Sequence, residues 1–356
     1  MLTLSHKRIL PQTLKSFCVE ALVRAGMREQ DAGIAAEVLV TTDTWGTYTH
    51  GTNHLRNYVN KIKAGGIDPQ AVPEVIAEGP SWAVVDGHSA LGMVTSCRAM
   101  ELAISKAKAG VISYVGVRNS AHFGAAGYYA NLAVQHDMIG LAMSNADSNM
   151  TGPGARGSLI GNNPLAYAVP AGRERPIFLD IALSAVASAK VWAAKALGKN
   201  IPDNWIVDAE GIPTTDVSKY PHASTLLPMA GHKGYGLALM VETLAAVLTG
   251  AAVTEEVKSW LLNLADRSCL GHAFLAINIG TIVPVELFKE RMDTMIRRIK
   301  ESPKAKGSER IYLPGEMEWE RRAEAVERGM LLPEDVIANL SAVAQDLGMD
   351  LTSLFP

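Results

Sequence analysis

The chain has 356 residues, a formal net charge of −3 at pH 7 and a hydrophobic share of 48%. A chain of this length can bury a sizeable core and is expected to form two domains. The net charge is slightly negative and lysines and arginines do not occur in runs. The protein therefore lacks the positive surface potential that attracts nucleic acid, and nucleic acid is not an expected partner.

Cysteine usage and the N-terminal sequence predict a cytoplasmic protein. Cys18, Cys97 and Cys269 are widely spaced and odd in number, which favours reduced, buried thiols over a disulfide framework. Residues 1–8 lack the basic start and apolar run of a signal peptide. The apolar stretch 237–253 contains Glu242, so we expect a buried helix there and no membrane association.

Apolar spacing predicts the elements in chain order. Helices are expected over 14–25 and 31–43, followed by a break at residues 65–73, which are rich in glycine and proline. From about residue 75 to 300 the pattern changes to an α/β layer architecture. Pro333 then opens a final amphipathic helix at a favoured N-terminal position. Within the α/β part, we expect a helix over 128–134 and strands over 82–86, 111–117, 139–143 and 176–180.

A loop histidine, His122, lies between the strand expected over 111–117 and the helix expected over 128–134. The small residues from Gly124 to Gly127 would let a ligand approach the first amides of that helix, where the positive dipole end favours phosphate. The alternative is a histidine that only hydrogen-bonds its own loop. We treat His122 as a candidate catalytic residue because the chain has a second group of histidines with small and polar neighbours.

A second cluster contains His50 and His54. The Thr49 hydroxyl can orient the His50 ring, as a general acid or base requires, and Gly51 keeps the backbone open beside it. Two histidines four residues apart could share a helix face and bind zinc. Because Gly51 disfavours a helix and the glutamate of an HExxH motif is missing, we predict no metal site.

A third candidate is Lys233, which lies among glycines in the segment Gly231–Gly236 at the start of a long apolar helix. Backbone amides and one point charge suit a phosphate, although glycine-rich helix starts are common. The chain has no Gly-x-Gly-x-x-Gly fingerprint in a βαβ context, so a Rossmann-type cofactor site is not predicted.

Six segments in order resemble the type 2 malate/L-lactate dehydrogenase family, whose relatives include ureidoglycolate dehydrogenase, sulfolactate dehydrogenase and piperideine-2-carboxylate reductase. They span most of the chain, and their order and spacing argue against a chance match. The segments are Thr49–Gly51 with Tyr58, Asn119–Gly124, Gly161–Ala166, Asp180–Ser184, Gly231–Gly234 and Leu313–Glu316.

The resemblance implies a non-Rossmann dinucleotide-binding domain with a mixed, largely antiparallel sheet over residues 76–299. A helical domain would form from both chain ends, residues 1–75 and 300–356. We expect NAD or NADP as the cofactor and a homodimer as the assembly. The residues implied to line the cofactor are His122, Phe123, Gly124, Ala125, Ala126, Asp180, Ile181, Ala182, Ser184, Lys233, Gly234, Pro314, Gly315 and Glu316.

Two of these residues have a clear physical reason to contact a dinucleotide. Asp180 at a strand end can accept hydrogen bonds from ribose hydroxyls, and Lys233 can pair with the pyrophosphate. Without the resemblance, Asp180 could equally be a strand-end or helix-capping carboxylate.

The implied reaction is reversible hydride transfer between nicotinamide C4 and C2 of a small 2-hydroxy acid, with a side chain that exchanges the hydroxyl proton. His50 matches the acid/base histidine of the family, with Thr49 in place of the more usual serine. His122 is the second candidate for this role, since some relatives assign it to that position, and it could instead contact the nicotinamide.

The chain departs from the family at the substrate carboxylate. Many relatives carry an arginine four residues after the catalytic histidine, where this chain has His54. A planar guanidinium binds a carboxylate through two hydrogen bonds. Because the family's arginine is missing here, Arg56, Arg118 or Arg156 would have to bind the substrate carboxylate instead. Arg56 is the nearest in sequence and is our preferred candidate.

Three further residues fall at substrate-site positions of the family. Lys190 stands where the cyclic imine reductases carry an aspartate that works with the histidine, which favours hydroxy-acid oxidation, although it could be a surface lysine. Asn162 stands where some relatives use threonine, and Tyr58 accompanies His50.

The prediction is an NAD(P)-dependent dehydrogenase of the malate/lactate type, acting on a small 2-hydroxy or 2-oxo acid. The alternatives are a cyclic imine reductase, a metal-dependent lyase or hydrolase built on His50 and His54, and a non-catalytic descendant that binds a ligand. The residues do not distinguish malate from lactate, ureidoglycolate or sulfolactate, nor NAD from NADP.

Overall fold

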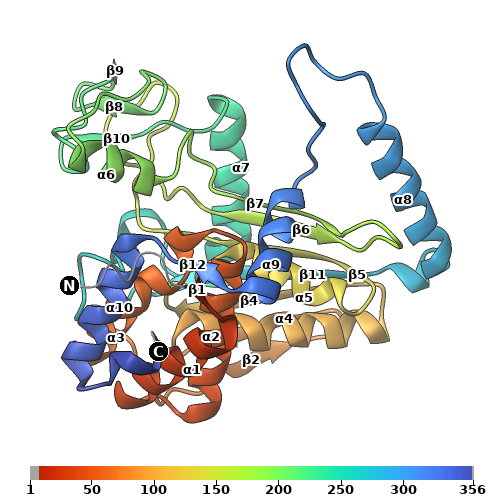
Figure 1. The fold of residues 1–356 in the computed structure, drawn as a ribbon, viewed down its shortest axis with the longest axis horizontal. Coiled ribbons are helices and arrows are strands. Elements are labelled where there is room, and N and C mark those ends of the chain that lie inside the picture. Colours follow the sequence, from red (N-terminus) through yellow and green to blue (C-terminus); the bar gives the residue numbers. More distant parts are fainter. Residues whose placement is uncertain (1–7, 355–356) are drawn as a thin grey trace.

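The computed structural model describes residues 8–354, and its centre is a seven-stranded sheet (Figure 1). The strand order is β2-β3-β4-β11-β5-β6-β7. Strands β3 and β4 run parallel, and the other neighbouring pairs are antiparallel. The expected mixed, largely antiparallel sheet is therefore confirmed. The strands are β2 (Glu74–Glu78), β3 (Trp82–Asp86), β4 (Ile112–Ser120), β5 (Met138–Ser144), β6 (Leu165–Val169), β7 (Ile177–Ile181) and β11 (Leu270–Asn278).

Two helices cover one face of this sheet. Helix α4 (Gly92–Ala109) links the parallel strands β3 and β4, as a parallel pair requires, and packs on β4 and β11. Helix α5 (Ala126–Val134) follows the His122 loop and packs on β5 and β6. The loop that carries His122 is thus held between the end of β4 and the start of α5.

The apolar stretch 237–253 forms helix α7 (His232–Glu242) and a π-helical turn over Thr243–Val247. The turn packs directly on β11, because a Cβ on Gly271 would lie 1.9 Å from the Ala245 carbonyl oxygen. The expectation of a buried helix holds for one side only. The other side exposes Leu237, Leu239, Met240, Val247 and Leu248.

Both chain ends build a helical layer against the sheet domain (Figure 1). Strand β1 (Arg8–Ile9) pairs with β12 (Met330–Leu331), and α9 (Glu316–Arg328) contacts α2. The boundaries at residues 75 and 300 stay a prediction. The other helices of the layer are α1 (Pro11–Arg24), α2 (Glu29–Thr44), α3 (Leu55–Lys63) and α10 (Glu334–Leu347).

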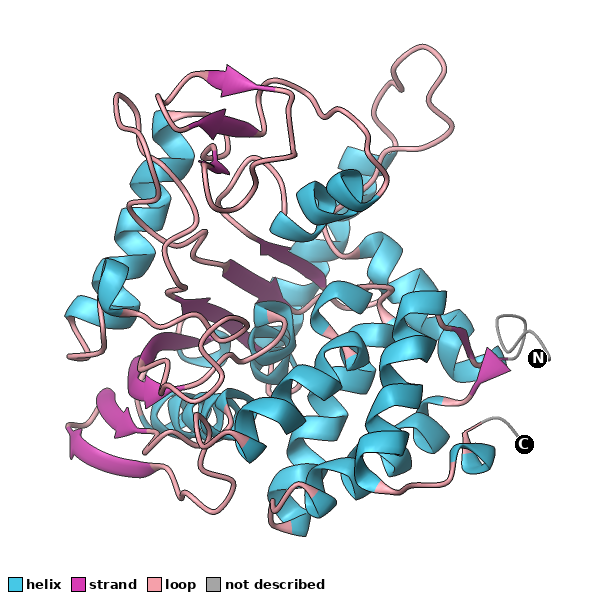
Figure 2. Ribbon diagram, turned by 90° about the vertical axis from the view of Figure 1, so that its left-hand side faces the viewer, coloured by secondary structure: helices cyan, strands magenta, loops and turns pink. Residues whose placement is uncertain are grey.

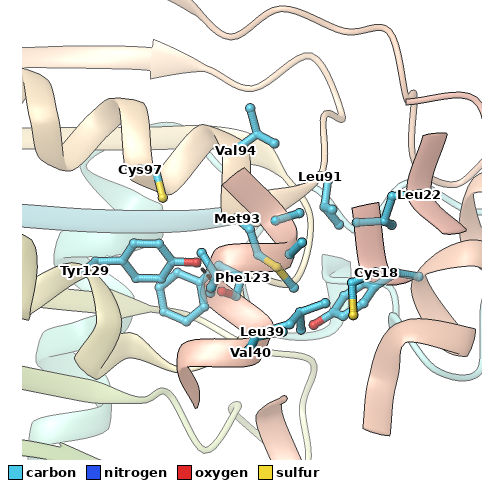
Figure 3. Close-up of a cluster of buried hydrophobic side chains, with 14 of the residues drawn as sticks. Cys18, Leu22, Leu39, Val40, Leu91, Met93, Val94, Cys97, Phe123 and Tyr129 are labelled. Atoms are coloured by element: carbon cyan, nitrogen blue, oxygen red, sulfur yellow. Dashed lines mark hydrogen bonds between the residues drawn. The ribbon is translucent and has the colours of Figure 1, made fainter. Parts of the chain in front are cut away.

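One hydrophobic core joins the helical layer to the sheet. Leu22 and Leu39 from the helical layer belong to the same cluster as Phe123 and Tyr129 (Figure 3). The Tyr129 hydroxyl donates a hydrogen bond to the Phe123 carbonyl, which fixes the backbone directly after His122 (Figure 3). The position of His122 therefore depends on this core.

A second core supports a smaller unit at one end of the molecule (top of Figure 2). Its sheet has the order β10-β8-β9, from Ser224–Leu226, Ile206–Asp208 and Pro213–Thr214, beside α6 (Ser188–Ala196). Helix α8 (Val285–Lys300) precedes an exposed loop over residues 301–309, which protrudes from the body (Figure 1). Within residues 8–354, no helix is long and apolar enough to cross a membrane.

Candidate active site

Three histidines from two distant segments converge. His50 ends one 3-10 turn (Tyr48–His50), His54 ends the next (Thr52–His54), and His122 follows β4. The ring centroids of His50 and His122 lie 6.1 Å apart, and those of His54 and His122 lie 6.4 Å apart. The structure therefore joins the two histidine motifs into one cluster.

The His50 ring is held by its neighbour. Thr49 Oγ1 lies 3.1 Å from His50 Nδ1, which is the contact expected from the sequence. Burial lowers the pKa of His50 below its usual 6.5, because the cation loses hydration. The imidazole is consequently neutral at pH 7 and able to accept a proton.

Tyr58 holds His122. The tyrosine is fully buried on α3, and its hydroxyl lies 2.7 Å from His122 Nδ1. Burial raises the pKa of Tyr58, so the hydroxyl keeps its proton. Burial is the first cause that holds the pKa of His122 well below 6.5, and repulsion from the protonated forms of His50, His54 and His272 adds to it. The pair is therefore uncharged at neutral pH.

His54 is also neutral at pH 7. Burial first, and the nearby His50 second, lower its pKa to about 4. Its Nδ1 lies 2.9 Å from the Asn57 side-chain nitrogen, one turn along α3. A neutral, hydrogen-bonded imidazole is a poor substitute for the cationic fork of an arginine.

A tryptophan that the sequence analysis did not single out covers the cluster. The Trp260 ring stacks on His122 with centroids 4.0 Å apart and an interplanar angle of 6°. It also lies 4.8 Å from His54 and 5.4 Å from Tyr58, centroid to centroid. Trp260 belongs to the irregular segment 251–269, where periodicity carries no signal, so a long-range contact of this kind could not be read from the sequence.

The backbone between His50 and His54 is held by Asp43, another residue that the sequence analysis did not single out. Asp43 lies buried near the end of α2, and its carboxylate accepts hydrogen bonds from the Thr52 amide and hydroxyl. Burial raises the pKa of Asp43 to about 7. Gly51 was expected to leave space beside His50, but that space is filled: a Cβ on Gly51 would lie 1.8 Å from Asp43 Oδ1.

Three of the segments expected to line the cofactor meet around β7. The Gly127 amide, in the first turn of α5, donates to Asp180 Oδ2 at 2.7 Å. The Phe178 amide donates to the Pro314 carbonyl at 3.3 Å, and a Cβ on Gly315 would lie 2.5 Å from the Phe178 ring. Asp180 therefore accepts a hydrogen bond at the start of α5, and Phe178 on the same strand contacts the Pro314–Gly315 turn.

Lys233 and Gly234 lie at the other end of this region. Beyond β7, Ser184 forms a bridge with Pro228, which leads into α7. Lys233 is exposed in the first turn of α7, whereas Gly234 is buried, with its backbone packed against the Met229 carbonyl. The helix start is thus open to a ligand on the lysine side.

A cavity of about 280 Å³ adjoins the Pro314–Glu316 turn. Its walls come from the start of β7, the end of α8 and the start of α9. Glu316 is not free there, because it pairs with Lys300 and accepts a hydrogen bond from the Leu313 amide. The lining residues include none of the clustered histidines, so the cavity is separate from the histidine cluster.

Comparison with known proteins decides the family. A family model described as malate/L-lactate dehydrogenase matches residues 9–341. The chain belongs to the malate/L-lactate dehydrogenase family. A malate dehydrogenase of Pyrococcus horikoshii is 37% identical over 354 residues, covering 97% of both chains. The solved structure of a sulfolactate dehydrogenase from Methanocaldococcus jannaschii superposes with a TM-score of 0.90 at 35% identity, covering 98% of this chain and 100% of that one.

More distant relatives carry other activities. An Escherichia coli ureidoglycolate dehydrogenase (NAD(+)) is 31% identical, covering 92% of this chain and 93% of its own. A Pseudomonas putida Δ1-pyrroline-2-carboxylate/Δ1-piperideine-2-carboxylate reductase is also 31% identical, covering 92% of this chain and 94% of its own. The predicted class, an NAD(P)-dependent 2-hydroxy-acid dehydrogenase, is confirmed.

The arginines considered as a carboxylate clamp in this dehydrogenase are each paired elsewhere. Arg56 binds Asp346 of α10 at 3.0 Å, and Arg118 binds Asp86 at 2.9 Å. Arg156, in the loop after β5, forms an exposed ion pair with Glu210 at 3.3 Å.

Lys190 and Asn162 of the dehydrogenase form no hydrogen bond or ion pair with the clustered histidines within the described residues 8–354. Lys190 is exposed on α6, and no hydrogen bond or ion pair within residues 8–354 joins it to His50 or His122. The Asn162 carbonyl accepts a hydrogen bond from the Leu183 amide. It is the neighbouring Asn163 that is fully buried and bonded to Glu242 of α7. Within the same range, no group of three potential ligands could hold a metal ion.

Proposed function

We propose that the dehydrogenase oxidises a malate-like 2-hydroxy acid with His50 as the acid/base group. The observation that carries this proposal is the pairing of His50 and His122 across 6.1 Å, with His50 oriented by Thr49. A neutral His50 can take the hydroxyl proton during oxidation and return it during reduction. The 37% identity to a malate dehydrogenase and to an L-sulfolactate dehydrogenase, each over nearly the full chain, supports a substrate of that class.

His122 plays a different part in this proposal. Its Nδ1 is engaged by the Tyr58 hydroxyl, and one ring face is covered by Trp260. The ring therefore has one nitrogen left for the substrate oxygen or the nicotinamide carboxamide. His122 orients the reacting groups while His50 exchanges the proton.

The region around β7 fits a nicotinamide dinucleotide. Asp180 receives a hydrogen bond from the Gly127 amide, and a carboxylate has further acceptor sites for ribose hydroxyls. Burial raises its pKa to about 6, so it is ionised at pH 7. The bound cofactor supplies the hydride acceptor at C4 of its nicotinamide ring. Because a carboxylate favours free hydroxyls over a 2′-phosphate, we propose NAD rather than NADP.

Other segments complete the proposed cofactor site. The cavity beside Pro314, Gly315 and Glu316 would take one end of the dinucleotide, and Lys233 would pair with its pyrophosphate. Between the cavity and Lys233, the backbone of Phe123–Ala126 and Ile181–Ser184 would line the cofactor. In this arrangement the cofactor follows the edge of β7 toward the histidine cluster.

A Lys233→Ala variant should bind NADH about 1–3 kcal/mol more weakly, because one charge-assisted contact is lost. Titration of bound NADH by fluorescence measures the dissociation constant directly. Lys199→Ala, which changes another exposed lysine of the chain, is the matched control and should leave the constant unchanged. Equal constants for all three proteins would show that Lys233 is only a solvated residue at a helix start.

We propose that Arg56, and not His54, binds the substrate carboxylate. The ion pair of Arg56 with Asp346 of α10 involves side chains that are 42% and 34% exposed, so breaking it costs little. The Arg56 side chain must then turn from α10 toward the histidine cluster. His54, with a pKa of about 4, stays neutral from pH 6 to 8.

The Michaelis constant for the 2-oxo acid should therefore vary little between pH 6 and 8. Arg56→Gln should raise it about 10-fold or more, the scale for losing a hydrogen bond to a charged group. His54→Gln should leave it within about 3-fold. A steep rise with pH that disappears in His54→Gln would instead identify a protonated His54 as the clamp.

We also propose that the dehydrogenase is a homodimer that uses α7. The exposed side of α7 and the following turn presents apolar side chains such as Met240, Val247 and Leu248, exposed by 39%, 62% and 58%. A contiguous apolar helix face of this kind fits a second copy of itself in a two-fold dimer. Light scattering would then give twice the 38.0 kDa chain mass. Met240→Glu should lower that mass, and a monomeric starting protein would refute the proposal.

A panel of 2-oxo acids assayed with NADH and NADPH tests the proposed substrate class. Oxaloacetate and sulfopyruvate with NADH should give the highest kcat/KM values. Greater activity on Δ1-piperideine-2-carboxylate would favour the cyclic imine reductase. Greater activity with NADPH would refute the proposed role of Asp180 in cofactor choice.

A further inference from the structure

Trp260 and His122 form the closest ring stack of the histidine cluster. Their centroids lie 4.0 Å apart and the rings are nearly parallel. The same indole lies over Tyr58 at 5.4 Å, and Tyr58 contacts His122 through its hydroxyl. His122 is therefore held on its edge by Tyr58 and on one face by Trp260.

A buried lysine holds the segment that carries Trp260. Lys61 of α3 is only 1% exposed, and its ammonium donates to the Asn263 and Asp266 carbonyls at 2.8 and 2.7 Å. Burial lowers the pKa of Lys61, while the charges of Asp266 and Asp147 oppose this. An ammonium that is buried to bond backbone carbonyls has a positional role, since a charge is costly to bury without partners.

Close packing at Gly66 reinforces this anchor. A Cβ on Gly66 would lie 2.2 Å from the Leu264 carbonyl oxygen and 2.8 Å from that of Asp266. The segment thus meets backbone directly after α3. His54, Tyr58 and Lys61 follow a spacing of four and three residues, which places them on one side of the helix. Segment 251–269 lies against that side.

We propose that Trp260 is a positioning residue for His122 and that Lys61 fixes it in place through segment 251–269. Stacking holds the imidazole plane at the orientation set by Tyr58 and keeps water from that face of the ring. The role rests on the proposed assignment of His122 to the active site. Trp260 and Lys61 both lie outside the six segments that resemble the family.

Removal of the indole should change the titration of His122. The groups facing this ring are His50 and His54 from the turns before α3, Tyr58 from α3 and His272 from β11. Replacement of Trp260 leaves each of these side chains present in the protein. Because burial is the largest cause of the low pKa of His122, opening one ring face should move the pKa upward toward 6.5.

The decisive experiment compares Trp260→Ala with Trp260→Phe, using NMR of labelled histidine rings and steady-state kinetics. In Trp260→Ala, His122 should titrate at higher pH and kcat should fall about 10-fold, with thermal stability measured in parallel. Trp260→Phe retains an aromatic face and should restore both properties. An unchanged His122 titration in Trp260→Ala would overturn the proposal, whatever the value of kcat.

A second pair of variants tests the anchor. Lys61→Met removes the ammonium but keeps the chain length, and it should reproduce the His122 titration of Trp260→Ala. Lys63→Met is the matched control, because Lys63 lies two residues along the helix and its ammonium donates an exposed hydrogen bond to the Asp346 carbonyl. A normal titration in Lys61→Met would refute the role of Lys61.

The NMR readout also separates this proposal from the proposed function. If His122 titrates as expected in these variants but His122→Ala retains full kcat, the positioning contact is real and the catalytic assignment fails. If His122→Ala is inactive and the titration is unchanged in Trp260→Ala, the assignment stands and the positioning proposal fails. The assignment of the His122 resonance comes from its loss in His122→Ala.

Discussion

A His50→Ala variant should oxidise the preferred 2-hydroxy acid about 100-fold or more slowly than the unchanged dehydrogenase, the usual effect of removing an acid/base group. The loss should be in kcat, because His50 is expected to exchange the proton and not to bind the cofactor. The dissociation constant of NADH should therefore stay within about 3-fold. Steady-state kinetics and a fluorescence titration measure the two quantities.

The pH dependence gives an independent check on the same residue. Oxidation needs neutral His50, and burial lowers its pKa below 6.5. The oxidation rate of the unchanged enzyme should thus be constant above pH 6.5 and fall only as the pH drops below that value. Reduction needs the protonated ring and should show the opposite trend.

Two comparisons make the His50 result interpretable. His136→Ala removes an exposed histidine in the turn after α5 and should leave kcat unchanged. His122→Ala should also lower kcat if this ring orients the substrate. Near-normal turnover in His50→Ala, combined with inactivity in His122→Ala, would transfer the acid/base role to His122.

The sequence predicted those elements whose hydrophobic pattern is local. The strand expected over 82–86 has those bounds, and the expected 139–143 and 176–180 strands lie within two residues of β5 and β7. Helix α2 extends two residues before and one after the predicted 31–43. These segments combine a clear apolar period with a glycine, proline or polar residue at one end.

The central strand β11 was not predicted individually, although it pairs with both β4 and β5. It contains His272, which is fully buried with its Nδ1 2.8 Å from the Ser144 hydroxyl. Burial lowers the pKa of His272 to about 3, so the ring is neutral in the core. A histidine in the middle of an apolar strand gives no local sign that its partner lies 128 residues away.

The candidate site was predictable where residues act within one motif and unpredictable where they act across the fold. The Thr49 contact to His50 follows from adjacency in the sequence. The Tyr58 contact to His122 spans 64 positions, and the stack of Trp260 on His122 spans a greater separation. The ion-pair partners of Arg56 and Arg118 could not be predicted either, because the sequence around an arginine does not indicate which distant carboxylate it will bind.

Gly51→Ala should be the most damaging single-methyl change near the site. The added Cβ would lie 1.8 Å from Asp43 Oδ1 and 3.2 Å from the Leu39 carbonyl oxygen. Asp43 cannot swing away freely, because it is buried and holds the Thr52 amide and hydroxyl. Overpacking of this kind costs about 3 kcal/mol of unfolding free energy, and the displaced turn carries His50.

A glycine on the same helix as Asp43 offers a matched control. Gly33 of α2 has open space around its hypothetical Cβ, so Gly33→Ala should stabilise the protein by about 0.5–1 kcal/mol through the better helix propensity of alanine. Urea unfolding of both variants measures the difference, and kcat should fall only in Gly51→Ala. The penalty for Gly51→Ala should also shrink in an Asp43→Ala background, since the clashing oxygen is then absent. Equal stability of Gly51→Ala and Gly33→Ala would mean that Asp43 does not pack against the His50 turn.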